Sequence, residues 1–336
     1  MTSPSSPPLV CVTGATGFVG QHVCRLLQES SQPFRRLVRP QHKNTISPDP
    51  SVCFGSLDQQ ETWSEFLQGA HTVIHLASKH IDLDQTGFHS TNVEGTKSLC
   101  QAAIQSKVKR IVYLSSVGVY GHSSLRQVEE SYPVRPDTAL SHSKAEAEQI
   151  LLHHHRQGDF QVVIARPRFI YGPGDQHFLP RLAKATQQRT WLPCSGKAAM
   201  SLVHVEDLAA LLLKFGRTAL PSDSHPVYHV ANDSPVHLRS IITNIATTLS
   251  CPPPRFVPIP FPLLYYPLKG LEYLTGTDPE TTKRSFTSIR LGFLSNHQWL
   301  STTKLRSQFP DFTFRRLEDS LSVALLRTED SAHTTT

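Results

Sequence analysis

Short apolar runs alternate with amphipathic stretches through the first half of the chain. Runs of strand length occur at residues 9–13, 34–38, 52–54, 72–76, 110–115 and 161–166. Stretches with helical spacing of apolar residues occur at 20–29, 62–67, 91–106 and 140–157. This alternation predicts parallel strands joined by right-handed helical crossovers. The sequence therefore predicts an α/β fold with a doubly wound parallel sheet.

The alternation loosens after about residue 170, where short helices and strands mix and prolines cluster. We expect a first domain at 9–170, with 201–231 returning to it. A smaller C-terminal lobe is expected at 171–200 and 232–325. The polar ends, 1–8 and 326–336, are expected to be disordered tails.

The segment Phe256–Leu274 comes nearest to a membrane span, but prolines and charged residues interrupt it. A helix that crosses a bilayer needs about 20 predominantly apolar residues in succession. We expect this segment to pack on the core of the smaller lobe, with a shallow membrane contact as the alternative. Stable membrane insertion is not expected.

Composition narrows the range of functions. The formal net charge of +6 suits an anionic ligand, and no run of five Lys or Arg residues indicates nucleic-acid binding. The six cysteines include no C-x-x-C pair, which indicates buried free thiols in a reducing compartment and hence a cytoplasmic location. The histidines at 153–155 lack partners at metal-ligand spacing, so no metal site is expected.

The strongest chemical signal is the segment T-G-A-T-G-F-V-G at 13–20, which follows a strand and opens a helix. Gly14 permits a tight turn, Gly17 lets the backbone approach a pyrophosphate, and Gly20 lets the helix pack closely on the strand. The helix N-terminus offers free N–H groups to the phosphates. The segment predicts dinucleotide binding and places the first domain in the Rossmann type.

The spacing G-x-x-G-x-x-G resembles that of extended short-chain dehydrogenases/reductases of the epimerase/dehydratase-like type. Five later segments carry the same resemblance over nearly the whole chain: V-I-H-L-A-S (73–78), N-V-E-G-T (92–96), Y-L-S-S-V-G-V-Y-G (113–121), R-P-R-F-I-Y-G-P-G-D (166–175) and S-L-V-H-V-E-D-L-A (201–209). The segments P-I-P-F-P-L-L-Y-Y-P-L and L-E-Y-L-T-G-T-D-P-E-T-T resemble the 3β-hydroxysteroid-dehydrogenase-like and quinovosamine-type branches, which leans towards a less polar substrate.

This resemblance implies a function and a set of site residues. The implied activity is NAD(P)-dependent hydride transfer at a hydroxyl or carbonyl carbon of a small molecule, with the C-terminal lobe binding the substrate. The implied catalytic residues are Ser116 and Lys144. The implied cofactor-binding residues are Gly14, Thr16, Gly17, Phe18, Val19, Gly20, Arg39, Ser56, Leu57, Leu76, Ala77, Ser78, Asn92, Ser115, Lys144, Pro167 and Ile170. By analogy, a homodimer would pair through the helices at 91–106 and 140–157.

Two positions bear on the cofactor. NAD sites favour an acidic residue about 20 positions after the glycines, whereas here the second strand ends at Arg39 and no acid follows until Asp49. An arginine pairs with a 2′-phosphate, so we expect NADP rather than NAD. The relatives' usual G-D-[LI] is G-S-L in this chain, so Ser56 predicts weaker adenine recognition without loss of binding.

A further position departs from the pattern of the family that the chain resembles, and it concerns the catalytic acid. The resemblance implies a tyrosine four residues before Lys144, one helical turn away, and the chain has Leu140 there. His142 should point away from the lysine face, and Ser141 has too high a pKa to be a good acid. Loop residues remain as candidates for a relocated acid: Tyr120, Tyr171 and His177.

Two readings follow from this departure. The first is an enzyme with atypical acid–base chemistry, in which a relocated acid or a water held by Lys144 relays the proton. The second is a catalytically impaired NAD(P)-binding sensor or scaffold. The retained Ser116 and Lys144 favour the enzyme, whereas Leu140 favours the sensor.

Overall fold

The computed structural model describes residues 7–46, 49–80, 87–219, 225–277 and 287–332. The chain forms two compact units. Unit 1 consists of residues 1–119, 136–166 and 206–228, and unit 2 of residues 120–135, 167–205 and 229–336.

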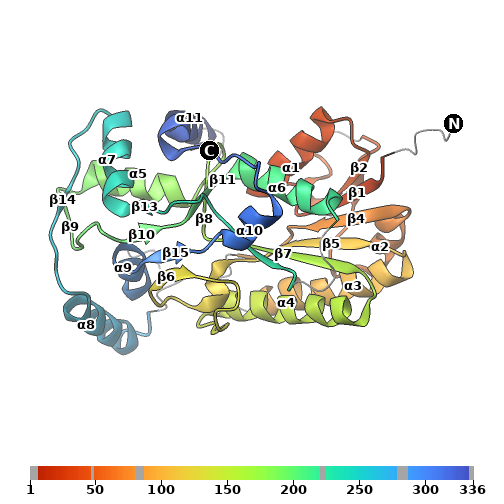
Figure 1. Cartoon of the computed structure of the whole chain (residues 1–336), viewed down its shortest axis with the longest axis horizontal. Helices are drawn as coiled ribbons and strands as arrows, with labels where there is room; N and C mark the ends of the chain where they lie inside the picture. Colours follow the sequence, from red (N-terminus) through yellow and green to blue (C-terminus); the bar gives the residue numbers. More distant parts are fainter. Residues whose placement is uncertain (1–6, 47–48, 81–86, 220–224, 278–286, 333–336) are drawn as a thin grey trace. The chain divides into compact units, whose positions relative to one another are not determined.

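Unit 1 is built on a seven-stranded sheet (Figure 1). Its strands are β1 (Leu9–Thr13), β2 (Phe34–Val38), β3 (Val52–Phe54), β4 (Ala70–His75), β5 (Arg110–Leu114), β7 (Gln161–Pro167) and β12 (Val227–Val230). The strand order is β12-β7-β5-β4-β1-β2-β3, and the neighbours from β3 to β7 pair in parallel. The predicted doubly wound fold is confirmed. The order reverses between β1 and β4, and ligands of such sheets bind at the carboxyl ends of the strands at this point.

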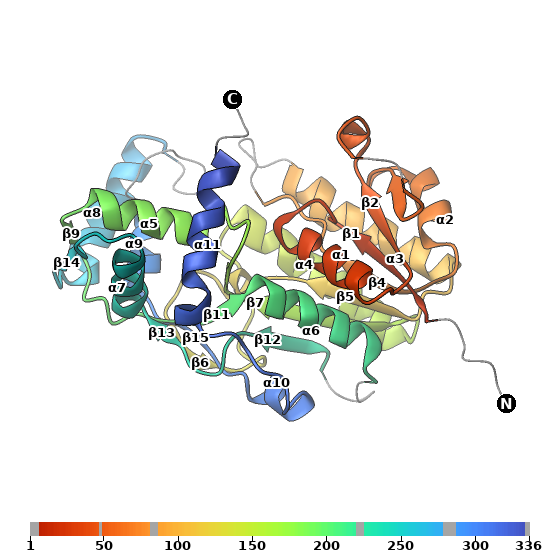
Figure 2. The same ribbon diagram turned by 90° about the horizontal axis from the view of Figure 1, so that it is seen from above.

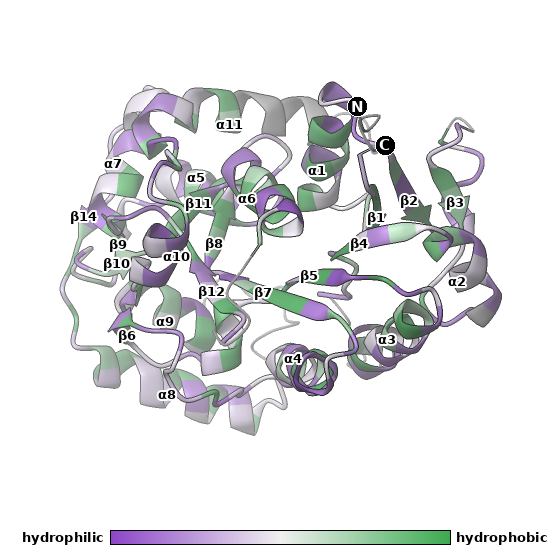
Figure 3. Cartoon of the chain, turned by 45° about the vertical axis from the view of Figure 1, so that its right-hand side comes forward, coloured by the Kyte–Doolittle hydropathy of each residue, from purple (hydrophilic) through white to green (hydrophobic). Residues whose placement is uncertain are grey.

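Helices cover both faces of this sheet, which explains its apolar strands. They are α1 (Phe18–Glu29), α2 (Gln60–Leu67), α3 (Gly95–Gln105), α4 (Ala139–Gln157) and α6 (Val205–Arg217), with the short turns η1 (Pro40–His42) and η3 (Val117–Tyr120). Helices α1 and α6 lie on one face and α2, α3 and α4 on the other (Figures 1 and 3). The single helix expected at 91–106 is instead a π-helical turn, η2 (His89–Glu94), followed by α3.

Unit 2 has its own core and three small sheets. Its strands are β6 (Leu125–Val128), β8 (Phe169–Tyr171), β9 (Trp191–Leu192), β10 (Ala199–Met200), β11 (Leu202–His204), β13 (Val236–His237), β14 (Arg255–Phe256) and β15 (Gln298–Leu300). Its helices are α5 (Phe178–Gln188), α7 (Leu238–Thr248), α8 (Phe261–Leu274), α9 (Ser288–Ser295), α10 (Thr303–Gln308) and α11 (Leu317–Ala332). Figure 2 shows α5, α7 and α11 together, and their apolar faces enclose a core that includes Leu179, Ile242 and Leu321.

The compact units divide the chain differently from the expected domains: residues 167–170 and 229–231 fall in unit 2, and two further segments differ because of strand pairing. Residues 120–135 belong to unit 2, because β6 pairs with β15 there. Residues 202–204 also belong to unit 2, because β11 pairs with β8, so the return to unit 1 begins at Glu206. Both differences arise from strand pairings between distant segments, which local sequence patterns do not specify.

The C-terminal tail was expected to begin at residue 326, but helix α11 continues to Ala332. The reason is an apolar stripe on α11, Leu317, Leu321, Ala324 and Leu325, which is buried in the core of unit 2 and anchors the helix. Residues 1–6 and 333–336, in the two expected tails, lie outside the described residues.

The apolar segment Phe256–Leu274 differs from the expected core-packed segment. Most of it forms α8, which packs beside α9, yet Glu272 is the one residue of α8 that is buried. Within the described residues, no helix is long and apolar enough to cross a membrane.

All six cysteines are free thiols, and Cys251 alone among them is partly exposed. Burial raises the pKa of Cys11 and of Cys100 to about 12 and that of Cys24 to about 11. Since the thiolate is the reactive form, these three side chains are inert at neutral pH. The prediction of buried free thiols is confirmed for five of the six positions.

Candidate functional site

The glycine-rich loop joins β1 to α1 at the carboxyl edge of the sheet. Gly14 has a φ of +71°, and a Cβ atom there would lie 2.5 Å from the backbone nitrogen of Ala77 at the end of β4. A Cβ atom on Gly20 would overlap the Gly14 carbonyl oxygen. Gly17 is the N-cap of α1 and has no side chain to satisfy the first N–H groups of the helix. The loop therefore fits a pyrophosphate, which these N–H groups can bind.

A buried chain of hydrogen bonds fixes β1, β4 and α3 relative to one another. Thr13 Oγ1 lies 2.7 Å from His75 Nδ1, and His75 Nε2 lies 3.2 Å from Thr96 Oγ1. Because the Thr96 hydroxyl donates to the Asn92 carbonyl oxygen, Nε2 carries the imidazole proton and Nδ1 accepts from Thr13. Burial, and secondarily the Lys144 ammonium, lowers the pKa of His75 to about 3, so His75 is neutral.

Asn92 joins the β4–η2 connection to helix α4. Its Oδ1 accepts from the Lys79 N–H at 2.8 Å and from the Ser78 hydroxyl at 3.1 Å. Its Nδ2 donates to the Lys79 carbonyl oxygen at 3.0 Å and to Ser143 Oγ at 2.9 Å. The predicted cofactor residue Asn92 thus has its amide atoms bonded within the protein, and through Ser143 it is linked to α4.

Helix α4 carries Lys144 one turn after Leu140. Its N-terminus is fixed by a capping box between Thr138 and Ser141. Lys144 is 8% exposed and its Nζ donates to the Leu114 carbonyl oxygen at 3.0 Å, at the end of β5. Burial lowers the pKa of Lys144 to about 8, while the Glu148 carboxylate acts in the opposite direction.

Ser116 lies just beyond the end of β5, close to the start of α4. Ser116 is partly exposed, and its Oγ accepts from the Gly118 N–H at 3.0 Å. A Cβ atom on Gly118 would lie 3.3 Å from Ser116 Oγ and 4.0 Å from Ser141 Cβ, so Ser116 and the first turn of α4 flank one another. The structure therefore brings Ser116 and Lys144, the two predicted catalytic residues, to the same edge of the sheet.

Within unit 1, the candidate replacement acids do not fill the place of the tyrosine. The Ser141 hydroxyl donates to the Thr138 carbonyl oxygen at 3.0 Å as part of the cap. His142 is exposed, as expected from its helical angle. Tyr113 lies under Lys144, with Nζ 4.9 Å from the ring centroid, but burial raises its pKa well above 10 and makes it a poor acid.

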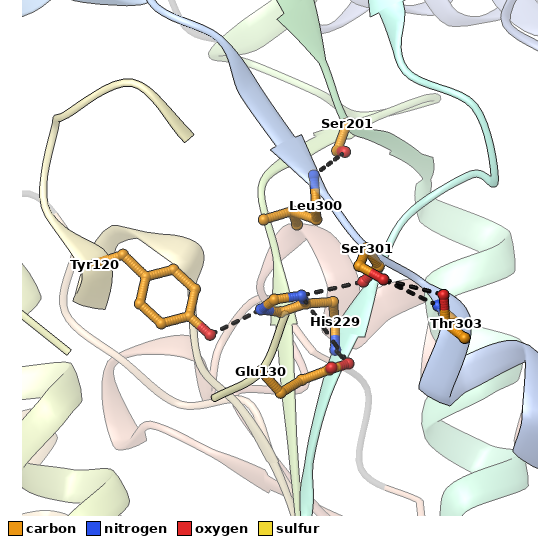
Figure 4. Close-up of polar contacts among 7 residues, drawn as sticks. All are labelled: Tyr120, Glu130, Ser201, His229, Leu300, Ser301 and Thr303. Atoms are coloured by element: carbon orange, nitrogen blue, oxygen red, sulfur yellow. Dashed lines mark hydrogen bonds and ion pairs between the residues drawn. The ribbon is translucent and has the colours of Figure 1, made fainter. Parts of the chain in front are cut away.

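Tyr120 is held within unit 2 by His229 (Figure 4). His229 Nδ1 lies 3.1 Å from the Ser301 carbonyl oxygen, which accepts its proton, so Nε2 accepts from the Tyr120 hydroxyl at 2.7 Å. The His229 backbone N–H donates to Glu130 at 2.9 Å. The phenolic proton of Tyr120 is therefore donated to His229 within this buried network.

The other two loop candidates, Tyr171 and His177, also belong to unit 2. The Tyr171 hydroxyl is buried and accepts from Ser320 Oγ at 3.3 Å. His177 is the exposed N-cap residue of α5. The predicted cofactor residues Pro167 and Ile170 lie in unit 2 as well.

A buried ion pair between Arg166 of β7 and Glu148 of α4 was not predicted from the sequence. Arg166 Nε donates to Glu148 Oε1 at 2.9 Å, and a second bond joins Arg166 Nη2 to Glu148 Oε2. The Ser115 hydroxyl donates to Glu148 Oε1 at 2.5 Å. Ser115, predicted to bind the cofactor, is thus bonded to Glu148. Glu148, the partner of Ser115, could have been found from the sequence. It stands one helical turn after Lys144 on the buried face of α4.

The edge of the sheet at β2 and β3 would face the adenosine half of a dinucleotide. Arg39 is exposed at the end of β2. The Ser56 hydroxyl donates to the Asp58 carboxylate, so a carboxylate lies one hydrogen bond from the position where the relatives' aspartate was expected. Asp58 was not predicted as a site residue, because it stands two positions after the one that the motif specifies.

The remaining predicted cofactor residues fall into two groups, one buried and one partly exposed. Val19 and Leu57 are buried, and Leu57 packs on Gly95 of α3, so their side chains belong to the core. The partly exposed residues line the carboxyl edge around the glycine loop and the end of β4: Thr16, Phe18, Leu76, Ala77 and Ser78.

The comparison with known families decides the family of the chain. The model of the NAD dependent epimerase/dehydratase family matches residues 10–231, about two thirds of the chain. The chain belongs to this family. It is accordingly an enzyme of the NAD(P)-dependent oxidoreductase and epimerase/dehydratase group that acts on small molecules.

Individual members of the family show how far the similarity extends. The chain is 32% identical over 250 residues to a 4-hydroxy-2-methyl-3-oxo-4-farnesyl-3,4-dihydroquinoline-1-oxide ketoreductase of Stigmatella aurantiaca, covering 70% of this chain and 72% of that protein. It is 26% identical over 295 residues to a UDP-glucose 4-epimerase of Vibrio cholerae, covering 81% and 86%.

Among solved structures, the Bordetella bronchiseptica enzyme WbmH in complex with NAD⁺ superposes with a TM-score of 0.74 at 18% identity, covering 96% of this chain and 99% of that one. This structural similarity confirms the fold. The relatives are reductases and epimerases, which favours the enzyme over the sensor.

Proposed function

We propose that this protein is an NADP-dependent ketoreductase for a ketone of low polarity. The observation that carries the proposal is the pairing of the hydroxyl of the partly exposed Ser116 with the Lys144 ammonium at one sheet edge, beside a glycine loop that fits a pyrophosphate. The ketoreductase of Stigmatella aurantiaca supports this choice, since its printed substrate name includes a ketone and a farnesyl chain.

Ser116 and Lys144, at the carboxyl edge of the sheet, have different roles in the proposed ketone reduction. The dinucleotide, when bound, supplies the hydride. The Ser116 hydroxyl donates a hydrogen bond to the substrate oxygen and polarises the carbonyl. The Lys144 ammonium binds the ribose hydroxyls and holds a water that passes a proton to the substrate oxygen. Leu140 leaves this step without a side-chain acid.

A reductase assay tests this function. We expect the full chain to oxidise NADPH in the presence of apolar ketones. Ser116→Ala should lower kcat/KM about 100-fold, because a preorganised donor to a developing oxyanion contributes about this much. Its affinity for NADPH, measured by titration, should be unchanged. The matched control is Ser90→Ala, since Ser90 is an exposed serine. Equal activities for Ser116→Ala and Ser90→Ala would remove Ser116 from the mechanism, and turnover of UDP-sugars alone would refute the ketoreductase.

The preference for NADP is supported by the groove beside β2. The nearest acid, Asp49, is bonded to Arg36 at 2.5 Å and to the Ser51 backbone N–H at 2.7 Å, so it is not available to a ribose diol. An open groove of about 1060 Å³ is lined by Thr16 of the glycine loop and by His42. His42 Nε2 is buried and has no hydrogen-bond partner within the described residues. Arg39, exposed at the end of β2, would pair with an anionic 2′-phosphate.

Replacing Arg39 should reverse the cofactor preference. We expect Arg39→Ser to weaken NADP binding about 10- to 100-fold, the range for loss of a hydrogen bond to a charged group. Binding of NAD, which lacks the 2′-phosphate, should change little. Isothermal titration of both cofactors measures the two affinities. An equal loss for NADP and NAD would mean that Arg39 acts on the fold and not on the phosphate.

Two further properties are proposed by analogy. A homodimer would form through α3 and α4, whose outer faces present Ile104, His142 and Glu146. A cytoplasmic location is supported by the free cysteines, because thiols persist in reducing compartments.

A further inference from the structure

Helix α8 exposes an apolar face to solvent. The large apolar and aromatic side chains Leu263, Tyr266, Leu271, Tyr273 and Leu274 are between 50% and 87% exposed. At 100° per residue, they span an arc of about 160° that also contains Pro267 and Gly270 and has no charged residue. Single exposed apolar residues are ordinary, whereas a continuous apolar helix face marks a binding surface.

The opposite side of α8 holds it in place. Glu272 is buried, and its carboxylate accepts from the Ser288 N–H at 2.7 Å and from the Ser288 hydroxyl at 2.6 Å, at the start of α9. This bond fixes α8 on α9, beside which it lies in Figure 1. Intrinsic propensity contributes little, because Pro267 removes a helical hydrogen bond and Gly270 favours other conformations. The helix is therefore held from one side with its other side free to bind.

The charges around this face select an anionic occupant. The two charged residues of α8 are the buried Glu272 and the exposed Lys269, whose Nζ lies 3.2 Å from the Tyr265 hydroxyl. At 100° per residue, Lys269 lies about 40° outside the apolar arc. Unit 2 has 18 Lys and Arg against 12 Asp and Glu, whereas unit 1 has 15 of each. The whole net charge of +6 therefore belongs to the unit that carries α8. A second copy of the same face would be repelled by this charge.

We propose that α8 is a membrane-surface helix that docks the protein on anionic phospholipid. Apolar side chains at this spacing enter the boundary between headgroups and acyl chains, and a lysine near the edge pairs with lipid phosphate. Tyrosines such as Tyr266 and Tyr273 suit the same depth, because each has an apolar ring and a polar tip. No described helix is long and apolar enough to cross a bilayer, which agrees with docking on the surface.

Vesicle sedimentation with the full chain and no substrate tests the proposal independently of catalysis. We expect the protein to sediment with vesicles of phosphatidylcholine mixed with phosphatidylglycerol, and less so at high salt. Tyr273→Ser/Leu274→Ser should weaken this binding at least about 100-fold, since both apolar contacts are lost. Lys269→Glu should weaken it about tenfold on the anionic vesicles and little on phosphatidylcholine alone. The matched control is Val323→Ser, an exposed apolar residue on α11.

Three results would overturn docking on lipid. The first is a wild-type chain that sediments with neither kind of vesicle. The second is a double variant that binds vesicles as well as Val323→Ser does. The third is found by light scattering: a wild-type dimer that the double variant converts to monomer, with vesicle binding unaffected, would assign the face to a second copy. The substituted side chains are exposed, so unchanged circular dichroism should accompany each variant.

Discussion

Leu140→Tyr should raise the rate of NADPH-dependent ketone reduction about 10²- to 10⁴-fold, the contribution of a positioned general acid. Position 140 stands one turn before Lys144 on α4, so a tyrosine there shares the lysine face. Leu140 is partly exposed, which leaves room for the larger ring. The capping box of Thr138 and Ser141 already fixes the backbone of this turn. The substitution therefore adds a phenol to a site whose other parts are in place.

The controls separate the proton from the shape of the ring. Leu140→Phe supplies a similar ring without a hydroxyl, and should not reproduce the gain in kcat. Adding Lys144→Met to Leu140→Tyr should abolish the gain, because the ammonium lowers the pKa of a neighbouring phenol. Equal rates for the Tyr and Phe variants would show that the wild type does not lack a side-chain acid at this point.

The pH profile gives a second measurement at the same site. Burial lowers the pKa of Lys144 to about 8. A lysine is charged below its pKa, so wild-type kcat/KM should be constant on the acidic side and fall as pH rises through about 8. A profile that is flat across this range would mean that the charge of Lys144 is not needed for the wild-type reaction.

The fold was predictable because its signals are local. Apolar runs of strand length, helical periodicity and T-G-A-T-G-F-V-G each specify one short stretch of chain, and the alternation of strand and helix then limits the topology. The pairings of β6 with β15 and of β11 with β8 join segments far apart in the sequence, so the boundaries of the units were less accessible. Helix α8 is an exception to the rule that apolar segments are buried, because most of its large apolar side chains are exposed.

The sequence predicts which residue types form the candidate site. It predicts less well the hydrogen bonds that these residues make. Ser116 and Lys144 follow from motifs, and the structure brings them to one sheet edge. Ser115 and Asn92 remain predicted cofactor residues, and the structure adds that the Ser115 hydroxyl bonds to Glu148 and the Asn92 amide to Ser143. A sequence gives the donors and acceptors present but not the direction in which each one points, because that depends on side chains packed from other elements.

Arg166→Met should lower the free energy of unfolding by about 3–5 kcal/mol, the cost of leaving a buried charge without its partner. Arg166 and Glu148 are 3% and 1% exposed, so water cannot solvate the carboxylate that remains. Urea denaturation followed by circular dichroism measures the change. Lys97→Met is the control: it breaks a surface pair with Glu94 in which both side chains are about half exposed, and should leave stability nearly unchanged.

The double variant Glu148→Met/Arg166→Met distinguishes loss of a charge partner from loss of packing. Removing both charges eliminates the uncompensated carboxylate, so most of the stability lost in Arg166→Met should return. If the double variant is as unstable as the single one, packing and not charge accounts for the loss.

The same double variant bears on the site, because Glu148 is the acceptor for the Ser115 hydroxyl and acts to raise the pKa of Lys144. Without this carboxylate, the pKa of Lys144 should fall further, and the decline of kcat/KM with pH should begin below the wild-type value. A stable double variant with an unshifted pH profile would mean that the Glu148–Arg166 pair maintains the fold without influencing Lys144.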